Sequence, residues 1–195
     1  MSNTAAIPSN QKIITVAQLK SQGYSYYKIN QLVQAGILVK LNKKTYENTQ
    51  FQGEDSDFYY AYAYAPEGIV CLMSAAVYYN LTTYRPDTID IAIQNKARIS
   101  TVPDWPMLQF YYYGKERYET GIQIIKDGPN QFQIYDLEKT VIDVICYRNK
   151  IGIQETKEIL TNYLKREDRN LNRLYRYGEK LRCSEVLRTY LEVLV

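Results

Sequence analysis

The 195-residue chain has the composition of an ordinary globular protein, with 46% hydrophobic residues and a net charge of +3 at pH 7. This balance argues against an intrinsically disordered chain. No apolar run approaches the ~20 residues that a membrane-spanning helix needs. The first ten residues show no basic region followed by an apolar stretch, so we expect no secretion signal and a cytoplasmic protein.

Few side chains are available for chemistry. Histidine is absent, which excludes Ser-His and Cys-His nucleophiles and removes the commonest protein ligand for metals. Cys71, Cys146 and Cys183 lie far apart in the chain and form no CxxC motif, as expected for free thiols in a reducing cytosol. We therefore expect neither a metal nor another cofactor.

The charge is unevenly distributed along the chain. Residues 1–50 contain six lysines and one glutamate, a net charge of +5. Residues 51–147 contain seven basic and thirteen acidic residues, a net charge of −6, and residues 148–188 return to +5. A basic N-terminal module is typical of proteins that bind a polyanion.

Two short helices are predicted near the N-terminus, after a loose tail over residues 1–12 and a short strand over 13–14. Thr15 is a predicted N-cap for a helix over 16–22, which a turn at Gly23 should end. Ser25 is a second predicted N-cap, and it should open a helix that ends near residue 35.

A β-hairpin should follow the second helix. Gly36 fits the position just past the helix end. Residues 37–41 then read as a strand, residues 42–43 as a tight turn and residues 44–46 as the return strand. Helix, glycine turn, helix and hairpin form the order of a winged helix-turn-helix.

The polar residues 47–56 mark the predicted domain boundary. We assign residues 1–50 to a winged helix-turn-helix domain and residues 54–195 to a mixed α/β (α+β) domain ending in a helical bundle. The predicted strands of the second domain cover 69–72, 89–93, 108–113, 122–125 and 132–135. Its predicted helices cover 57–64, 74–80, 136–148, 153–165, 168–182 and 184–195.

The second predicted helix divides into two faces at 3.6 residues per turn. Ile29, Leu32 and Val33 form the apolar face. The opposite face carries Tyr27, Asn30, Gln31 and Gln34. Asn and Gln can pair with adenine edges in the major groove, which is where a recognition helix lies.

The hairpin adds positive charge beside this helix, from Lys40, Lys43 and Lys44. Wing lysines of this kind contact DNA phosphates. A solvated polar helix face would explain the helix alone, but the glycine turn, hairpin and lysines together favour binding to double-stranded DNA.

Several segments resemble the AbiEi antitoxins of bacterial type IV (AbiE-like) toxin–antitoxin systems. GYSYYKINQLVQAGIL at 23–38 is similar to their recognition-helix segment, and KKTY at 43–46 stands where their wing ends. GIVCLMSAA at 68–76 is similar to their strand-to-helix segment, with Leu81 at its helix end. DLEKTVID at 136–143 resembles their Asp-x-Glu-Lys-Thr-x-x-Asp helix start.

The resemblance implies two functions. The winged domain would repress its own operon by binding the promoter, typically at inverted repeats, and the C-terminal domain would carry antitoxicity. The partner toxin would resemble a nucleotidyltransferase and be countered without a stable complex. Residues 1–12 depart from the family because they form a poor helix where it has its first one. We therefore expect Ile29 and Leu32 to be covered by the C-terminal domain or by another chain.

A second basic surface is predicted in the C-terminal region. Its residues are spaced by three and four positions and would form one stripe along a helix: Arg166, Arg169, Arg173, Arg176 and Lys180. Leu171, Leu174 and Leu181 should point the other way. The stripe is either a second surface for DNA phosphates or a solvated basic face.

Two other groups of residues suggest alternatives. A carboxylate-dependent nucleic-acid enzyme would use Asp87, Asp90, Asp136, Glu138 and Lys139, although Asp136 is better explained as an N-cap and Glu138 as a first-turn acid. The tyrosine-rich run 58–64 could stack RNA bases or pack at the domain boundary. We favour a non-enzymatic DNA-binding antitoxin and autorepressor; a stand-alone winged-helix regulator is the alternative.

Overall fold

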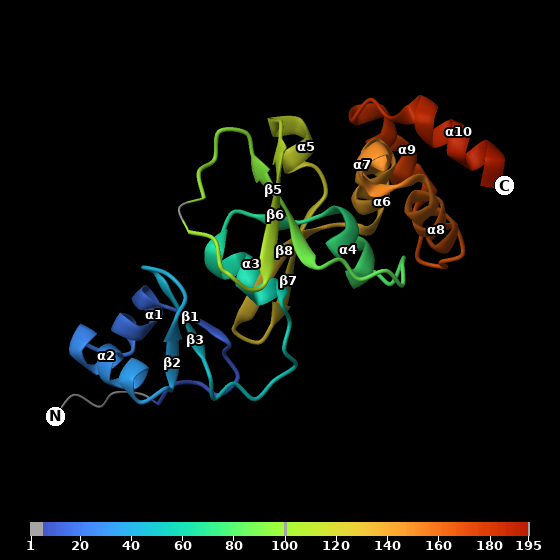
Figure 1. Cartoon of the computed structure of the whole chain (residues 1–195). Helices are drawn as coiled ribbons and strands as arrows, with labels where there is room; N and C mark the ends of the chain where they lie inside the picture. The colour runs from blue at the N-terminus through green and yellow to red at the C-terminus, as the bar shows by residue number, and fades with distance from the viewer. Residues whose placement is uncertain (1–5, 100, 195) are drawn as a thin grey trace.

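The computed structural model describes residues 6–99 and 101–194, which form a mixed α/β protein with two sheets (Figure 1). The N-terminal unit consists of β1 (Ile13–Thr15), α1 (Val16–Ser21), α2 (Tyr26–Gln34), β2 (Leu38–Lys40) and β3 (Thr45–Asn48). Its strands pair antiparallel in the order β1-β3-β2. The predicted helices and hairpin are confirmed, and β1 adds a third strand beside the hairpin.

The local sequence explains both helices. Thr15 forms a complete capping box with Gln18 at the start of α1, and the Ser25 side chain accepts a hydrogen bond from the Lys28 amide at the start of α2. Both helices end in a Schellman motif with glycine at a positive φ, +86° at Gly23 and +72° at Gly36. A side chain at either glycine would be strained, which is why the turns fall at these residues.

The N-terminal sheet is covered on both faces because side chains alternate along a strand. Ile14 and Tyr46 point toward α1 and α2, in a cluster with Leu19, Ile29 and Leu38. Ile13 instead belongs to the core of the C-terminal domain, where it packs with Tyr59 and Tyr60. The two units therefore share this sheet: one face packs against α1 and α2, and the other packs against the C-terminal domain.

Two expectations about the N-terminal segment are wrong: that Ile29 needs cover from the C-terminal domain or another chain, and that the end of the 1–12 tail is loose. Ile29 is fully buried by residues of its own unit, and Ile7 packs against the same cluster, so neither the C-terminal domain nor another chain is needed as cover. Residues 1–5 lie outside the described part, but Gln11 and Lys12 are buried. Residues 6–12, which form no helix, thus supply part of the cover that a first helix would give.

The C-terminal domain is built on a five-stranded mixed sheet in the order β6-β5-β4-β8-β7 (Figure 1). Its strands are β4 (Ile69–Val70), β5 (Thr88–Gln94), β6 (Met107–Tyr113), β7 (Ile122–Asp127) and β8 (Asn130–Tyr135). β5 and β6 pair in parallel, as do β4 and β8, whereas β4–β5 and β7–β8 pair antiparallel. The five predicted strands are present.

Helices surround this sheet and form the C-terminal end of the molecule (Figure 1). They are α3 (Phe58–Tyr64), α4 (Leu72–Tyr78), α5 (Lys115–Glu119), α6 (Leu137–Cys146), α7 (Arg148–Ile151), α8 (Ile153–Leu164), α9 (Leu171–Lys180) and α10 (Ser184–Leu194). The buried apolar face of α6, including Val141 and Ile145, packs with α4, α8, α9 and α10 in one core. The predicted helical bundle is present.

Some predicted boundaries are wrong. Leu72 begins α4 rather than ending the preceding strand, and the helix predicted to run to residue 148 breaks at Tyr147. The helix predicted from residue 168 begins at Leu171, and α5 was not predicted. Asn48, placed in the predicted linker, is fully buried in β3 and donates hydrogen bonds to the carbonyls of Pro8 and Gln11.

Candidate nucleic-acid interface

The two faces of α2 are as predicted. Ile29 is fully buried, whereas Tyr27 exposes 72% of its surface. The other proposed contacts on this helix, Asn30, Gln31 and Gln34, are also exposed. The side-chain amides of Asn30, Gln31 and Gln34 therefore face solvent. They stand on a helix that is capped at both ends and buried along its opposite face at Ile29.

The hairpin holds its lysines in solvent beside this helix. Lys40, Lys43 and Lys44 are exposed, and β2 contacts α2. The turn is shaped by Asn42, whose side-chain oxygen accepts hydrogen bonds from the Lys44 and Thr45 amides at 2.8 and 3.1 Å. The structure thus brings the seven predicted contact residues into one unit, on α2 and the adjacent hairpin.

Asn42 also fixes the hairpin against the C-terminal domain. Its Nδ2 donates to the Ala63 carbonyl at 2.8 Å, at the end of α3. Sequence reasoning treated Asn42 only as a turn residue. The turn chemistry was visible in the sequence, but the carbonyl partner lies 21 residues away and leaves no local signal.

One of the six N-terminal lysines is not available to a polyanion. Lys12 is buried and forms ion pairs with Glu47 and Asp55 at 3.0 and 2.7 Å. Burial alone would lower its pKa, but these two carboxylates outweigh burial and hold the pKa of Lys12 above its usual range. Lys12 therefore joins the N-terminal unit to the linker.

Further contacts at this seam fix the position of the N-terminal unit. The Asn130 side chain at the start of β8 accepts from the Lys12 amide at 2.7 Å and donates to the Asn10 carbonyl at 2.9 Å. The Tyr60 hydroxyl donates to Glu47 at 2.8 Å. These contacts orient α2 and the hairpin relative to the C-terminal domain.

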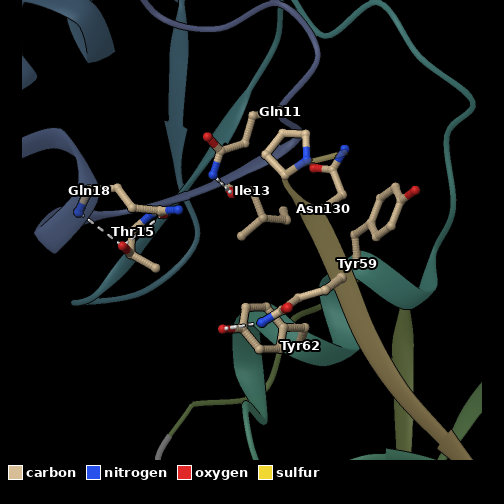
Figure 2. Close-up of a pocket in the computed structure, with 9 residues that line it drawn as sticks. Gln11, Ile13, Thr15, Gln18, Tyr59, Tyr62 and Asn130 are labelled. Atoms are coloured by element: carbon tan, nitrogen blue, oxygen red, sulfur yellow. Dashed lines mark hydrogen bonds between the residues drawn. The ribbon is translucent and has the colours of Figure 1, made fainter. Parts of the chain in front are cut away.

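A small cavity of about 170 Å³ lies at the same seam (Figure 2). The N-terminal unit contributes Gln11, Ile13, Thr15 and Gln18, and the C-terminal domain contributes Tyr59, Tyr62, Pro129, Asn130 and Gln131. None of these lining residues is an acidic or basic residue. The cavity offers amide and hydroxyl groups to water or a small polar molecule.

The tyrosine-rich run packs at the seam rather than presenting its rings to RNA. Tyr59 and Tyr60 are 5% and 6% exposed, and the Tyr59 hydroxyl donates to Asp127 at 3.1 Å. Phe58 packs against Phe132 of β8 with ring centroids 5.2 Å apart. Two central rings of the predicted stacking platform are therefore inaccessible.

The predicted basic stripe is not a single helical stripe. Arg166 and Arg169 precede α9, because Asn170 caps this helix through the Arg173 amide. Arg166 pairs with Asp168 and donates to the Tyr79 carbonyl, and Arg173 pairs with Glu138. Leu171, predicted to face inward, is 39% exposed, whereas Leu174 and Leu181 are buried.

What remains is a smaller basic surface. Arg169, Arg176 and Lys180 are exposed, and none of them forms an ion pair with another described residue. We call these three residues the α9 basic surface. It lies at the opposite end of the molecule from α2 (Figure 1).

The carboxylates predicted for the alternative function, a nucleic-acid enzyme, do not come together in one site. Asp136 caps α6 by accepting from the Lys139 amide at 2.8 Å, as predicted, and Asp87 is exposed. Asp90 accepts from the Met73 amide at the start of α4, and burial raises the pKa of Asp90 to about 6. Glu138 is buried and accepts from the Asn170 amide. No group of three potential metal-ligating side chains occurs among residues 6–99 and 101–194.

Instead, Lys139 belongs to a buried ion-pair cluster with Asp143 and Arg117. Lys139 and Asp143 are fully buried and joined by a hydrogen-bonded salt bridge, and Arg117 donates to the other Asp143 oxygen at 2.5 Å. The Lys139 ammonium lies 3.8 Å from the centroid of the Tyr135 ring. The cluster connects α5 to α6.

The chain matches no protein-family model and no curated protein. The resemblance to AbiEi antitoxins therefore stays a prediction from the quoted motifs. Within the part of the chain that the structure describes, no helix is both long and apolar enough to cross a lipid bilayer.

Proposed function

We propose that the protein is a cytoplasmic, non-enzymatic DNA-binding antitoxin that represses its own type IV toxin–antitoxin operon and counters a nucleotidyltransferase-like toxin. The observation that carries DNA binding is the exposed amide face of α2 beside the exposed lysines of the hairpin. The N-terminal unit acts as a winged helix-turn-helix, with α2 as the recognition helix and β2–β3 as the wing. Its order, α1, glycine turn, α2 and hairpin, supports this assignment.

Each part of this surface has a distinct role. Asn30, Gln31 and Gln34 present both a donor and an acceptor and are suited to reading adenine edges in the major groove. Tyr27 reaches a phosphate or a thymine methyl. Lys40, Lys43 and Lys44 contact phosphates, which positions the helix without reading sequence.

Two variants separate base reading from phosphate contact. Replacing Lys40, Lys43 and Lys44 together with alanine should weaken binding to every sequence and lower the slope of log affinity against log salt by roughly three. The variant Asn30→Ala/Gln31→Ala should weaken operator binding by roughly tenfold to 100-fold and leave nonspecific binding unchanged. Both are measured by titrating fluorescent promoter DNA and a scrambled duplex at several salt concentrations.

The control variant is Lys115→Ala/Lys126→Ala, which removes two exposed lysines from the C-terminal domain. It should leave both the affinity and the salt slope unchanged. If both test variants bind promoter DNA like the unaltered protein and the control, α2 and the hairpin do not contact DNA and the proposal is wrong. A footprint on the DNA upstream of the gene should show protection at inverted repeats.

The α9 basic surface is proposed as a second contact with DNA phosphates. Because it lies at the far end of the molecule from α2 (Figure 1), it can reach only flanking DNA beyond the operator core. The variant Arg169→Ala/Arg176→Ala/Lys180→Ala should therefore lower the salt slope by roughly three on a long fragment and leave a minimal operator unaffected. An unchanged slope on the long fragment would mean that this surface is only solvated.

Antitoxicity needs a separate test, because a stand-alone regulator would bind DNA equally well. We expect the neighbouring gene to encode a nucleotidyltransferase-like toxin whose expression stops growth. Co-expression of this protein should restore growth, including when it carries Asn30→Ala/Gln31→Ala, while the purified pair should not form a stable complex. Growth arrest that persists with the full protein would leave the regulator as the correct assignment.

A further inference from the structure

Two cysteines that are 37 positions apart in the sequence meet in the C-terminal domain. Cys146 is the last residue of α6, and Cys183 immediately precedes α10. The same Arg117 nitrogen donates to the Cys146 sulfur and to the carbonyl of Leu181, two residues before Cys183, and α6 packs against α10, so the two thiols lie close together. Cys146 is half-buried, and Cys183 is 4% exposed.

Arg117 makes Cys146 unlike an ordinary buried thiol. Its guanidinium donates to the Cys146 sulfur at 3.4 Å and to the Leu181 carbonyl at 3.4 Å, so it touches both segments that carry the cysteines. The hydrogen bond from Cys183, assisted by Arg117, lowers the pKa of Cys146 to about 7, although burial opposes this. These contacts favour the thiolate of Cys146, which is the reactive form of cysteine.

The third cysteine offers an internal comparison. Cys71 is fully buried, and burial raises its pKa well above the usual range. A cysteine in these surroundings is inert because it is both inaccessible and protonated. The same chain thus contains one thiol suited to oxidation, one resolving thiol beside it and one protected thiol.

We propose that Cys146 and Cys183 are a peroxide-sensitive thiol pair that forms an intramolecular disulfide. The Cys146 thiolate attacks one oxygen of hydrogen peroxide, the O–O bond breaks, and Cys146 sulfenic acid and hydroxide form. The Cys183 sulfur then attacks the sulfenic sulfur, the S–O bond breaks, and the oxygen leaves as water with the Cys183 proton. In total, two thiols and one hydrogen peroxide give one disulfide and two waters.

The disulfide would link the end of α6 to the start of α10. These helices otherwise hold together through apolar packing, including Leu187 of α10. A covalent link between residues 146 and 183 closes a loop that contains α7, α8 and α9 and restricts the unfolded chain. Oxidation should therefore stabilise the C-terminal helices.

The experiment is a titration of the reduced, full-length protein with hydrogen peroxide at neutral pH. Intact mass spectrometry should show the loss of two hydrogen atoms, and peptide mapping should find the Cys146–Cys183 cross-link with Cys71 unmodified. In Cys183→Ser, where a hydroxyl can still donate to Cys146, the reaction should stop at a sulfenic acid that dimedone traps on Cys146. Trapping at Cys146 should be at least roughly tenfold faster than at Cys71.

Cys146→Ser is the matched control, and it should give neither a disulfide nor a dimedone adduct on Cys183. The proposal is overturned if the unaltered protein stays reduced or if Cys71 reacts as fast as Cys146. It is also overturned if the cross-links join different molecules. Circular dichroism of both serine variants establishes that they are folded before the comparison.

Discussion

Replacing Asp143 with alanine is expected to lower the free energy of unfolding by about 3–5 kcal/mol. Asp143 is fully buried between Lys139 and Arg117, and the Lys139 side chain has no exposed surface. Without the carboxylate, the Lys139 charge is left in an apolar and aromatic surrounding with the Tyr135 ring as its nearest compensation. Urea denaturation followed by circular dichroism measures the loss.

The pH dependence of the free energy of unfolding shows why the Asp143→Ala variant is less stable. Burial lowers the pKa of Lys139, and Asp143 opposes that shift, so removing Asp143 lowers the pKa of Lys139 further in the folded protein. Between the lowered pKa of folded Lys139 and ~10.4, the ordinary lysine pKa, the unfolded chain binds a proton that the folded chain lacks. This window extends to lower pH in the variant, so the deficit relative to the unaltered protein should shrink as the pH rises from the pKa of Lys139 in the variant to its higher pKa in the unaltered protein.

The matched control replaces both partners, as Lys139→Met/Asp143→Leu. It should lose much less stability than Asp143→Ala, because a buried ion pair replaced by apolar groups of similar volume is often near neutral. Arg117 keeps partly exposed surface and its contact with the Leu181 carbonyl, so it retains other partners. If the double variant is as unstable as the single one, the cause is lost packing rather than an unpaired charge.

The features that could be predicted from sequence are those with local causes. Thr15 and Ser25 act as N-caps, and Gly23 and Gly36 act as helix ends, through groups within five residues in the chain. The two faces of α2 follow from its periodicity alone. These local signals were sufficient to predict the candidate DNA surface as a set of residues.

The features that could not be predicted depend on distant partners. Arg166 fits a regular basic spacing in the sequence, yet its guanidinium donates to the Tyr79 carbonyl, 87 positions away. Lys12 is one of the lysines that make residues 1–50 basic, yet its ammonium forms ion pairs with Asp55 and Glu47. Charge counts describe composition, whereas the burial and pairing of each charge depend on the fold.

The cover of α2 differs from the prediction for a related reason. The sequence of residues 1–12 predicts a poor helix, but an irregular segment can also cover a buried side chain. Ile7 contributes to the cluster around Ile29, and the Asn48 side chain satisfies the carbonyls of Pro8 and Gln11. Because these buried carbonyls have partners, the segment needs no helix to be stable.

Replacing Ile29 with alanine is expected to destabilise the N-terminal unit by about 2–5 kcal/mol, because a fully buried isoleucine leaves a cavity in a small core. Only a few large side chains, Ile14, Leu19, Leu38 and Tyr46, are buried with it. DNA affinity should fall with the folded fraction of the unit. Native-state hydrogen exchange with mass spectrometry measures the effect in each element separately.

Gln31→Ala is the matched control on the exposed face of the same helix. It should change stability by less than about 0.5 kcal/mol, since it removes no buried contact, yet it should weaken operator binding if α2 reads DNA. Ile29→Ala should therefore lower both quantities, whereas Gln31→Ala lowers only the affinity.

The pattern of exchange decides whether the two units unfold separately. Ile29 belongs to the core of the N-terminal unit, while Ile13 on the same sheet belongs to the core of the C-terminal domain. If the seam is weaker than either core, Ile29→Ala should speed exchange in α1 and α2 and leave α6 protected. Equal acceleration in α6 would mean that the shared sheet makes the protein one cooperative unit, so that damage to the C-terminal domain would also reach α2.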